Sequence, residues 1–419
     1  MKEDITFLFK NTKFPYLWFS QIFSQITINM MNYLLLIRLY ENTNSTLAIS
    51  FLWVSYSLPV ILIGPVAYAM VDILDRRKVL IATNFFQAML VFFYAIYARS
   101  FVFGAYGIAF FYSLLNQFYV PSESSSITSL VERKYLPQAN GLFFVTQQLS
   151  LILGFALASV INNFIGFDLS LYVCAAFLFI GFISVTFLPK MKFSEKQKGD
   201  VENGIISFFQ SIYSGYKYIR TNKNIFITLA VLISVQIMYS IIVISVPTIS
   251  ETLLDVPAKL SGVFLVIPAG IGSMLGAIYI PMFLKNKWRK RRLVETSLLV
   301  IATLLFTETF LIYYLPAVAR LIISGVIILF IGVFFTGILI PSQTFLQENT
   351  SDEYKGRIFG NMWFITTIAT VIPVIFYGFF TELFGIKLVL ASISFACLTM
   401  YYFSKRDNLK FFEYEKNKS

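Results

Sequence analysis

Long apolar segments alternate with short polar segments along the whole chain. A helix needs about 20 mainly apolar residues to cross roughly 30 Å of hydrocarbon. Twelve segments reach that length, namely residues 15–37, 47–70, 79–98, 101–121, 139–161, 168–188, 225–247, 259–284, 293–314, 317–340, 358–380 and 386–403. The pattern therefore predicts an all-α polytopic membrane protein with twelve transmembrane helices.

One connection is much longer than the others and divides the chain. Residues 189–224 separate the sixth apolar segment from the seventh, so that six segments lie on each side. We therefore predict an N-terminal six-helix bundle at 1–188, a cytoplasmic linker at 189–224, a C-terminal six-helix bundle at 225–403 and a cytoplasmic tail at 404–419.

The two halves share weak sequence features. Pro121-Ser122 begins the loop after the fourth segment, and Pro341-Ser342 begins the loop after the tenth. The loops after the second and eighth segments, DRRK and KNKWRKRR, are both basic, although only the first contains an acid. Such a 6+6 repeat is typical of transporters that bind substrate between the repeats, near the middle of the membrane.

Basic residues are concentrated in alternate connections. If the N-terminus is inside, the inside segments hold 28 of the 33 Lys and Arg residues. This bias follows the positive-inside rule, so we expect a multi-pass protein of the cell membrane with both termini in the cytoplasm. The net charge of +11 then lies beside the anionic inner leaflet, and we expect no nucleic-acid partner.

The composition also excludes several kinds of chemistry. Hydrophobic residues make up 57% of the chain and charged residues 13%, against about 25% charged residues in soluble domains. The chain has no histidine, and its two cysteines, Cys174 and Cys397, lie in apolar segments. We therefore expect no metal and no cofactor. An intramembrane enzyme or sensor is disfavoured, because no nucleophile, base or acidic cluster is evident and no GxxxxGK[ST] loop is present.

Five stretches resemble one known family in their order and in their expected side of the membrane. They are FPYLWFSQIFSQ, GPVAYAMVDILDRRKVL, PSESSSITSLVERKYLPQANGL, GYKYIRTNKNIF and PSQTFLQENTSDEYKGRIFG. Together they resemble the major facilitator superfamily, and within it the third drug:proton antiporter group, which includes macrolide efflux pumps and the enterobactin exporter. The resemblance implies the major facilitator fold, with two six-helix bundles, and function as a monomer.

The resemblance assigns a role to the charged loop after the second span. In the family, the aspartate that matches Asp72 sits near the cytoplasmic N-terminus of span eleven, where the helix dipole favours a carboxylate by about 0.3–1 kcal/mol. This contact is expected only when the protein is closed inside and open outside. The resemblance thus implies a conformational latch of Asp72, Asp75, Arg76 and Arg77. The alternative is a solvated turn whose charges anchor the loop.

The chain departs from the family pattern at a few positions. Tyr68 stands where the family usually has glycine, and Ile73 where it has arginine. Phe155 replaces a usual proline in the fifth span, and Ile28 and Asn29 stand where the group often has an acid. These departures bear on proton coupling more than on the fold.

Polar residues inside the spans are candidates for the substrate path, because such residues usually face a bundle interior or a cavity. On a helix of 100° per residue, the four amides of the first span fall within an arc of about 80°. The alternative role for these side chains is to hold helices together. The candidates are Gln21, Gln25, Asn29 and Asn32 in the first span, Asn116 and Gln117 in the fourth, and Gln236 and Tyr239 in the seventh.

Two carboxylates are candidate proton carriers. Glu123 lies at the inner mouth of the fourth span, and Glu308 lies in the outer half of the ninth. For Glu308 the alternative is a carboxylate at the outer interface, because span nine is peripheral in the family.

The leading hypothesis is a secondary active exporter of a hydrophobic or amphipathic small molecule, such as a drug, macrolide or siderophore. It would work by alternating access and proton antiport in the lipid bilayer. The alternative is a lipid flippase, or an uncoupled or uptake carrier of the same fold.

Overall fold

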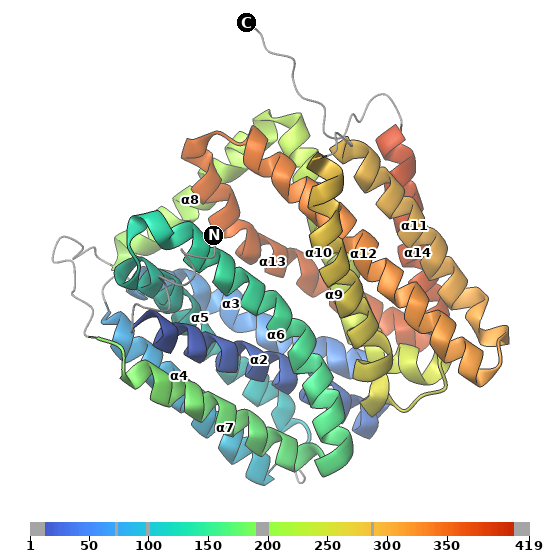
Figure 1. The fold of residues 1–419 in the computed structure, drawn as a ribbon, viewed down its shortest axis with the longest axis horizontal. Coiled ribbons are helices and arrows are strands. Elements are labelled where there is room, and N and C mark those ends of the chain that lie inside the picture. Colours follow the sequence, from blue (N-terminus) through green and yellow to red (C-terminus); the bar gives the residue numbers. More distant parts are fainter. Residues whose placement is uncertain (1–12, 72–73, 98–100, 190–200, 286–288, 406–419) are drawn as a thin grey trace, which may run out of the picture. The chain divides into compact units, whose positions relative to one another are not determined.

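The computed structural model describes residues 13–71, 74–97, 101–189, 201–285 and 289–405. Within these ranges the chain forms thirteen α-helices and no strand (Figure 1). The helices are α2 (Phe14–Thr43), α3 (Thr46–Val71), α4 (Arg76–Tyr97), α5 (Gly104–Leu130), α6 (Leu136–Ile165), α7 (Phe167–Thr186), α8 (Val201–Thr221), α9 (Lys223–Leu253), α10 (Ile267–Lys285), α11 (Lys290–Phe310), α12 (Ala317–Asn349), α13 (Asp352–Phe384) and α14 (Ile386–Lys405). The predicted all-α class is confirmed.

Eleven of the described helices are long and apolar enough to cross a membrane. Each overlaps one of the twelve predicted spans. The remaining predicted span, 101–121, lies in α5, which is 27 residues long but carries polar residues such as Asn116 and Gln117. α8 has no counterpart among the predicted spans, because it lies inside the segment predicted as a linker.

Large apolar side chains are widely exposed on these helices. Phe164 on α6 is 80% exposed and Ile372 on α13 is 76% exposed, and many other Phe, Leu and Ile side chains behave similarly. Apolar surfaces of this extent are rare on soluble monomers. They are expected where the surrounding medium is hydrocarbon.

The chain divides into two compact units, Met1–Asn44 with Phe51–Phe209, and Ser45–Ser50 with Gln210–Ser419. In the first unit, α2 packs against α6 and α7, and α4 packs against α5 and α7. Its largest buried side chains include Phe14, Tyr112 and Tyr119, all with no exposed surface.

In the second unit, α10 packs along α12, and α11 packs against α12 and α14. Glycines permit the close approach of α10 and α12. A Cβ added at Gly272 would lie 1.9 Å from the Leu329 carbonyl oxygen, and one at Gly332 would lie 2.2 Å from the Ala269 carbonyl oxygen. Small residues at helix contacts are the usual means by which membrane helices approach this closely.

A single glycine joins two successive helices at the corresponding place in each unit. Gly166 lies between α6 and α7 with φ of +82°, and Gly385 lies between α13 and α14 with φ of +80°. Glycine adopts such positive φ values without the steric penalty that a Cβ imposes. The same turn therefore recurs in both units, which supports the internal repeat.

Candidate functional site

The charged loop between α3 and α4 contains a helix cap. One side-chain oxygen of Asp75 accepts hydrogen bonds from the backbone N–H groups of Arg77 and Lys78, at 3.1 and 3.4 Å. The carboxylate thus satisfies N–H groups in the first turn of α4 and lies at the positive end of its dipole. Asp72 and Ile73 lie outside the described residues, so the latch assigned to Asp72 stays a prediction.

The two arginines that begin α4 reach the C-terminal ends of neighbouring helices. Arg77 Nη2 donates to the carbonyl oxygen of Thr186, the last residue of α7, at 2.6 Å. Arg76 Nη1 donates to the carbonyl oxygen of Ser125 at 3.1 Å and to Ser129 Oγ at 3.2 Å, near the end of α5. Cations are disfavoured at a helix N-terminus but favoured at a C-terminus, so these contacts place the charges where they stabilise the bundle.

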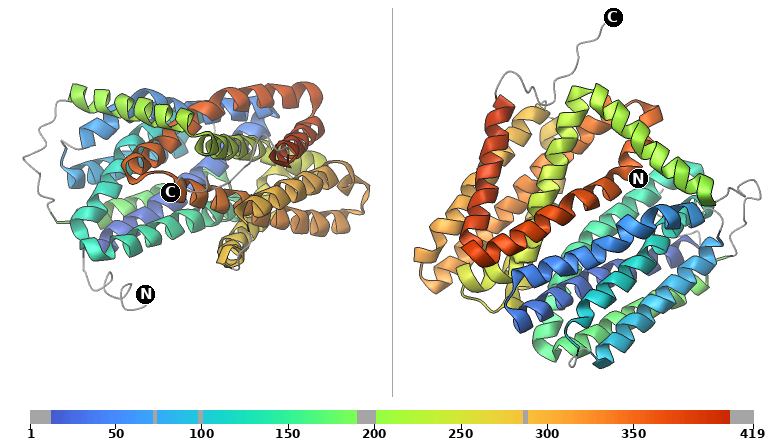
Figure 2. Two further views of the ribbon diagram at one scale, coloured as in Figure 1. Left: turned by 90° about the horizontal axis from the view of Figure 1, so that it is seen from above. Right: turned by 180° about the vertical axis from the view of Figure 1, so that it is seen from behind.

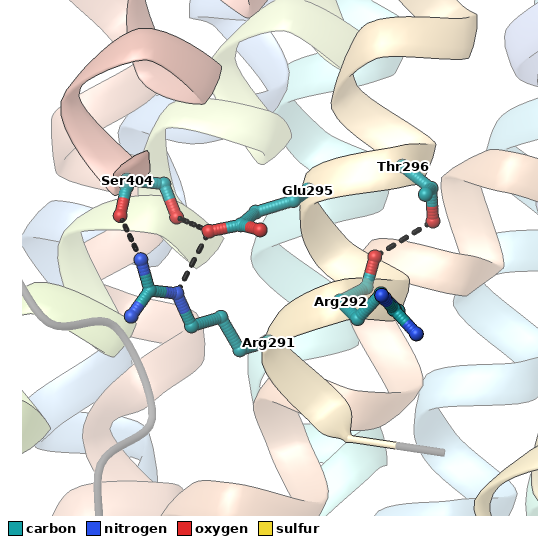
Figure 3. Close-up of polar contacts among 5 residues, drawn as sticks. All are labelled: Arg291, Arg292, Glu295, Thr296 and Ser404. Atoms are coloured by element: carbon teal, nitrogen blue, oxygen red, sulfur yellow. Dashed lines mark hydrogen bonds and ion pairs between the residues drawn. The ribbon is translucent and has the colours of Figure 1, made fainter. Parts of the chain in front are cut away.

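The second unit repeats this arrangement at the start of α11 (Figure 3). Arg291 donates from Nη2 to the Ser404 carbonyl oxygen of α14 at 2.7 Å, and from Nε to Glu295 Oε1 at 2.8 Å. Ser404 Oγ also donates to Glu295 Oε1, at 2.7 Å. Lys290, the first residue of α11, pairs with Glu348 near the end of α12.

The basic pairs 76–77 and 290–291 therefore hold equivalent helices together in the two units. α4 joins α5 and α7 in the first unit, and α11 joins α12 and α14 in the second. The similar charge of the two loops indicates this repeat in the sequence. Glu348 of α12 and Ser404 of α14 carry no such signal in the sequence, because they lie far along the chain from this loop.

The amides of α2 make contacts with α6. Gln21 is buried, and its Nε2 donates to the Phe143 carbonyl oxygen at 3.1 Å. Asn29 Nδ2 donates to the Gln25 carbonyl oxygen one turn earlier, at 2.7 Å. A Cβ added at Gly154 of α6 would lie 2.5 Å from the Asn29 Cβ. Gln21 and Asn29 thus lie at a helix contact, while Gln25 and Asn32 are half-buried.

The family pattern in the fifth span now has a local explanation. Gly154 allows α6 to approach the α2 backbone, because its missing Cβ would lie 2.9 Å from the Ile26 carbonyl oxygen. Phe155, which stands where the family usually has proline, packs edge-on against Tyr33 of α2 with ring centroids 5.5 Å apart. The close approach is therefore retained, and an aromatic contact is added beside it.

The polar candidates of α5 face α3 instead. The Asn116 side chain lies beside the Tyr56 hydroxyl of α3. Gln117 Nε2 donates to the Ser113 carbonyl oxygen of its own helix at 3.1 Å, and its Oε1 lies 3.5 Å from the position of a Cβ at Gly64. The candidates on α2 and α5 therefore contact different helices.

The candidates on α9 lie in the second unit. Tyr239 stacks on Phe335 of α12, with ring centroids 5.5 Å apart and an angle of 28° between the planes. Gln236 is half-buried one turn earlier, and its carbonyl oxygen accepts a hydrogen bond from Ser240 Oγ. Their assignment to a substrate path stays a prediction.

Glu123 is buried and belongs to a chain of hydrogen bonds across three helices. Its Oε1 accepts a 2.8 Å hydrogen bond from the Tyr119 hydroxyl, which lies 3.4 Å from Ser20 Oγ of α2. Asn84 Nδ2 of α4 donates to the same Ser20 Oγ at 3.3 Å. Glu123 is 5% exposed, and the other three side chains have no exposed surface. Sequence reasoning identified Glu123 but not its partners, because hydroxyl and amide residues are common in these helices.

The same bundle contains buried polar atoms without a hydrogen-bond partner among the described residues. They include Asn84 Oδ1, Gln21 Oε1, Ser122 Oγ and both polar side-chain atoms of Gln87. In hydrocarbon, an unpaired buried polar group costs several kcal/mol. The interior of the first unit is thus able to hydrogen-bond further groups near Glu123.

Glu308 occupies a different setting in the second unit. It is 3% exposed and accepts a hydrogen bond from Ser324 Oγ, which joins α11 to α12. Its other side-chain oxygen is buried without a partner among the described residues. The carboxyl is therefore buried between helices, and its role as a proton carrier or as a carboxylate at the outer interface stays a prediction.

Comparison with known proteins gives a consistent family. The profile of the Major Facilitator Superfamily matches residues 17–374. Macrolide efflux protein A of Streptococcus pyogenes is 25% identical over 391 residues, which covers 90% of this chain and 91% of that protein. The putative bacilysin exporter BacE of Bacillus subtilis is 25% identical over 323 residues, which covers 72% of each chain.

One further relative and one solved structure agree with this result. The uncharacterized MFS-type transporter YfiS of Bacillus subtilis is 23% identical over 353 residues and covers 82% of this chain and 80% of its own. The crystal structure of the nucleoside transporter NupG superposes with a TM-score of 0.65 at 13% identity, covering 92% of this chain and 97% of that chain. The structural likeness bears on the fold alone.

Proposed function

The chain belongs to the Major Facilitator Superfamily, and from this premise we propose that it is a proton-driven exporter of a hydrophobic or amphipathic small molecule. It is a transporter of small molecules rather than an enzyme. The direction of transport is supported by two relatives named for export, macrolide efflux protein A and the putative bacilysin exporter. The charge bias of the connections supports a cell-membrane protein with cytoplasmic termini. We propose function as a monomer from the family resemblance alone.

The observation that carries the coupling is the buried carboxyl of Glu123 in its hydrogen-bonded chain. An ionised carboxylate only accepts hydrogen bonds, whereas a protonated carboxyl also donates one. When Glu123 is ionised, the Tyr119 hydroxyl donates to it. When Glu123 is protonated, the carboxyl can donate to Tyr119, whose own proton can then turn to Ser20. Protonation thus changes the contact between α5 and α2.

The burial of Glu123 determines which arrangement of the helices each protonation state favours. An ionised group in a medium of low dielectric constant carries a penalty of several kcal/mol, which protonation removes. Protonated Glu123 therefore favours the buried arrangement of α2, α4 and α5, and ionised Glu123 favours an arrangement open to water. A residue that alternates between these states can exchange a proton for substrate movement. Glu308 is also buried but does not belong to a comparable chain of hydrogen bonds among the described residues, so we propose it only as a secondary proton carrier.

We further propose that the substrate path uses the amide and aromatic side chains named above. Gln25, Asn32, Gln236 and Tyr239 are the strongest members, because Gln21, Asn29, Asn116 and Gln117 already make contacts between helices or within their own helix. This lining is polar but uncharged, which suits bulky amphipathic compounds better than small ions.

A second candidate is an uncoupled carrier or a lipid flippase of the same fold. The observation in its favour is the first span, where Ile28 and Asn29 replace the acid common in the drug:proton antiporter group. Phe155, which stands where the family usually has proline in the fifth span, also favours a carrier that is not coupled to protons.

The test is transport in proteoliposomes, with a panel of macrolides, cationic dyes, siderophores and a fluorescent phospholipid, with and without an imposed pH gradient. The wild type should move one compound of the panel in response to the gradient. Glu123→Gln should retain substrate exchange but lose the response. Glu132→Gln is the matched control, because this carboxylate is 61% exposed just beyond α5. Gradient-driven transport by Glu123→Gln equal to that of the control would exclude Glu123 as the carrier. Transport of a compound by the wild type that does not depend on the pH gradient would favour the uncoupled carrier or lipid flippase.

A further inference from the structure

α8 is a helix that directly precedes a membrane span. It ends at Thr221, and α9, one of the eleven candidate spans, begins at Lys223. The single residue between them, Asn222, has an extended backbone, and its Nδ2 donates to the Tyr218 carbonyl oxygen at 2.9 Å. The chain turns sharply at this point (Figure 2). The end of α8 therefore lies directly beside the start of a candidate membrane span.

One face of the C-terminal part of α8, which belongs to the second unit from Gln210 onward, packs on that unit. Tyr218 stacks on Tyr354 of α13, with ring centroids 4.3 Å apart and planes 12° apart. The Tyr218 hydroxyl also accepts a hydrogen bond from the Ser351 backbone N–H, at 3.2 Å. Ile219 packs on a core cluster that includes Ile225 and Leu346. These contacts fix how α8 is rotated about its axis.

A second face of α8 carries large apolar side chains that are exposed. Ile206, Phe209, Tyr213 and Tyr216 are 45%, 51%, 69% and 55% exposed. Their spacing of three, four and three residues places them within an arc of about 80° on a helix of 100° per residue. We call these four residues the apolar stripe. It lies beside the packed face rather than within it.

A third face is polar and completes the pattern. Gln210, Lys217 and Thr221 are exposed and lie between the apolar stripe and the position of Tyr218 around the helix. Arg220, also exposed, lies at the end of the stripe nearest the membrane span. A helix that combines an apolar face with a basic polar edge suits the plane of a membrane surface.

We propose that α8 is a membrane-surface helix whose apolar stripe inserts into the inner leaflet and whose Lys217 and Arg220 contact anionic lipid headgroups. The partner is the lipid surface because α9 holds the helix at that surface, and because the basic edge complements anionic headgroups. The connection between the two halves of the transporter is then attached to the bilayer. The proposal does not depend on which compound is transported.

The test places spin labels on the full-length protein in phosphatidylglycerol vesicles, in a background with Cys174→Ala and Cys397→Ala. Single cysteines at Phe209 and Tyr213 report the apolar stripe, and cysteines at Gln210 and Lys217 on the same helix are the matched controls. Collision with oxygen reports lipid, and collision with a water-soluble nickel chelate reports water. We expect the stripe labels to lie about 5–10 Å below the headgroup level and the control labels to lie in water.

Two results would overturn the proposal. Equal exposure of all four labels to nickel would place α8 in water, and protection of the stripe labels from both reagents would mean that protein covers it. A second measurement tests the charges. The combined change Lys217→Gln and Arg220→Gln should move the Phe209 label toward water in phosphatidylglycerol vesicles but not in phosphatidylcholine vesicles. The same depth in both lipids, with and without these changes, would overturn the assignment of an anionic partner.

Discussion

The contact between α10 and α12 allows a quantitative prediction. In Gly332→Ala, the new Cβ would lie 2.2 Å from the Ala269 carbonyl oxygen, whereas an ordinary contact needs at least 3.4 Å. The two helices must therefore separate by about 1.2 Å, or the side chains around them must repack. Such overpacking typically costs about 1–3 kcal/mol, and the better helix propensity of alanine returns up to about 1 kcal/mol. We expect a net destabilisation of about 1–2 kcal/mol, confined to the second unit.

The chain carries a natural reporter for this effect in each unit. Cys174 is buried in α7 of the first unit, and Cys397 is buried in α14 of the second. A thiol-reactive dye in detergent, with Cys174→Ala or Cys397→Ala to leave one cysteine, reports the unfolding of each unit separately. A loss of 1–2 kcal/mol corresponds to a fall of about 2–8 °C in the midpoint temperature for a unit of this size. The fall is expected at Cys397 and not at Cys174.

The control is Gly325→Ala on the same helix. A Cβ at Gly325 meets no atom within 4 Å, so this change should leave the midpoint unchanged or raise it slightly. If Gly332→Ala and Gly325→Ala unfold at the same temperature at Cys397, the close approach of α10 and α12 has no energetic role. A fall at both cysteines would instead show that the two units unfold together.

Four further predictions follow, three from the polar contacts and one from the latch that the family resemblance implies. Tyr119→Phe removes the hydroxyl that links Glu123 to α2 but keeps the carboxyl, so gradient-driven transport should fall less than in a Glu123→Gln variant, as measured by flux in proteoliposomes. Arg291→Met should lower the midpoint temperature at Cys397 by an amount that corresponds to about 1 kcal/mol, because it removes two charged hydrogen bonds that are partly exposed. Arg292→Met changes an exposed neighbour and should leave this midpoint unchanged. An equal fall in both variants would contradict the role of the contact with α14. Asp75→Ala should lower the midpoint temperature at Cys174, because the lost helix cap is worth about 1 kcal/mol. Asp72→Asn should abolish net export with little change in that midpoint. Full export by Asp72→Asn would exclude the latch.

The positions of the membrane spans are readable from the sequence because they depend on local composition. A helix satisfies its own backbone hydrogen bonds, so about 20 apolar residues suffice to define a span without knowledge of its neighbours. Eleven of the twelve predicted spans coincide with helices that meet the same criterion. α5 falls short because polar residues such as Asn116 and Gln117 lower its hydropathy, and only the structure shows that Asn116 lies beside Tyr56 of α3.

α8 shows a different limit of sequence reading. The sequence predicts a linker here, because the segment has no apolar run of membrane length. The stripe at 206, 209, 213 and 216 has helical spacing, but spacing alone does not separate a face that packs on protein from one that faces outward. The stacking of Tyr218 on Tyr354, which lies far away in the sequence, settles which face is packed. The outward direction of the stripe follows from that contact.

The sequence by itself thus determined the helical class, the approximate ends of the spans and the positions where charge and polarity interrupt them. Only the tertiary structure decided what each polar group contacts. Arg291 and Ser404 are 113 residues apart, and Trp18 and Thr146 are 128 residues apart, yet each pair shares a hydrogen bond. A helix forms from interactions within a few residues, whereas the partner of a buried polar side chain depends on which helices lie beside it. That choice is made by packing across the whole bundle, where glycines such as Gly154 and Gly332 set how closely two helices approach.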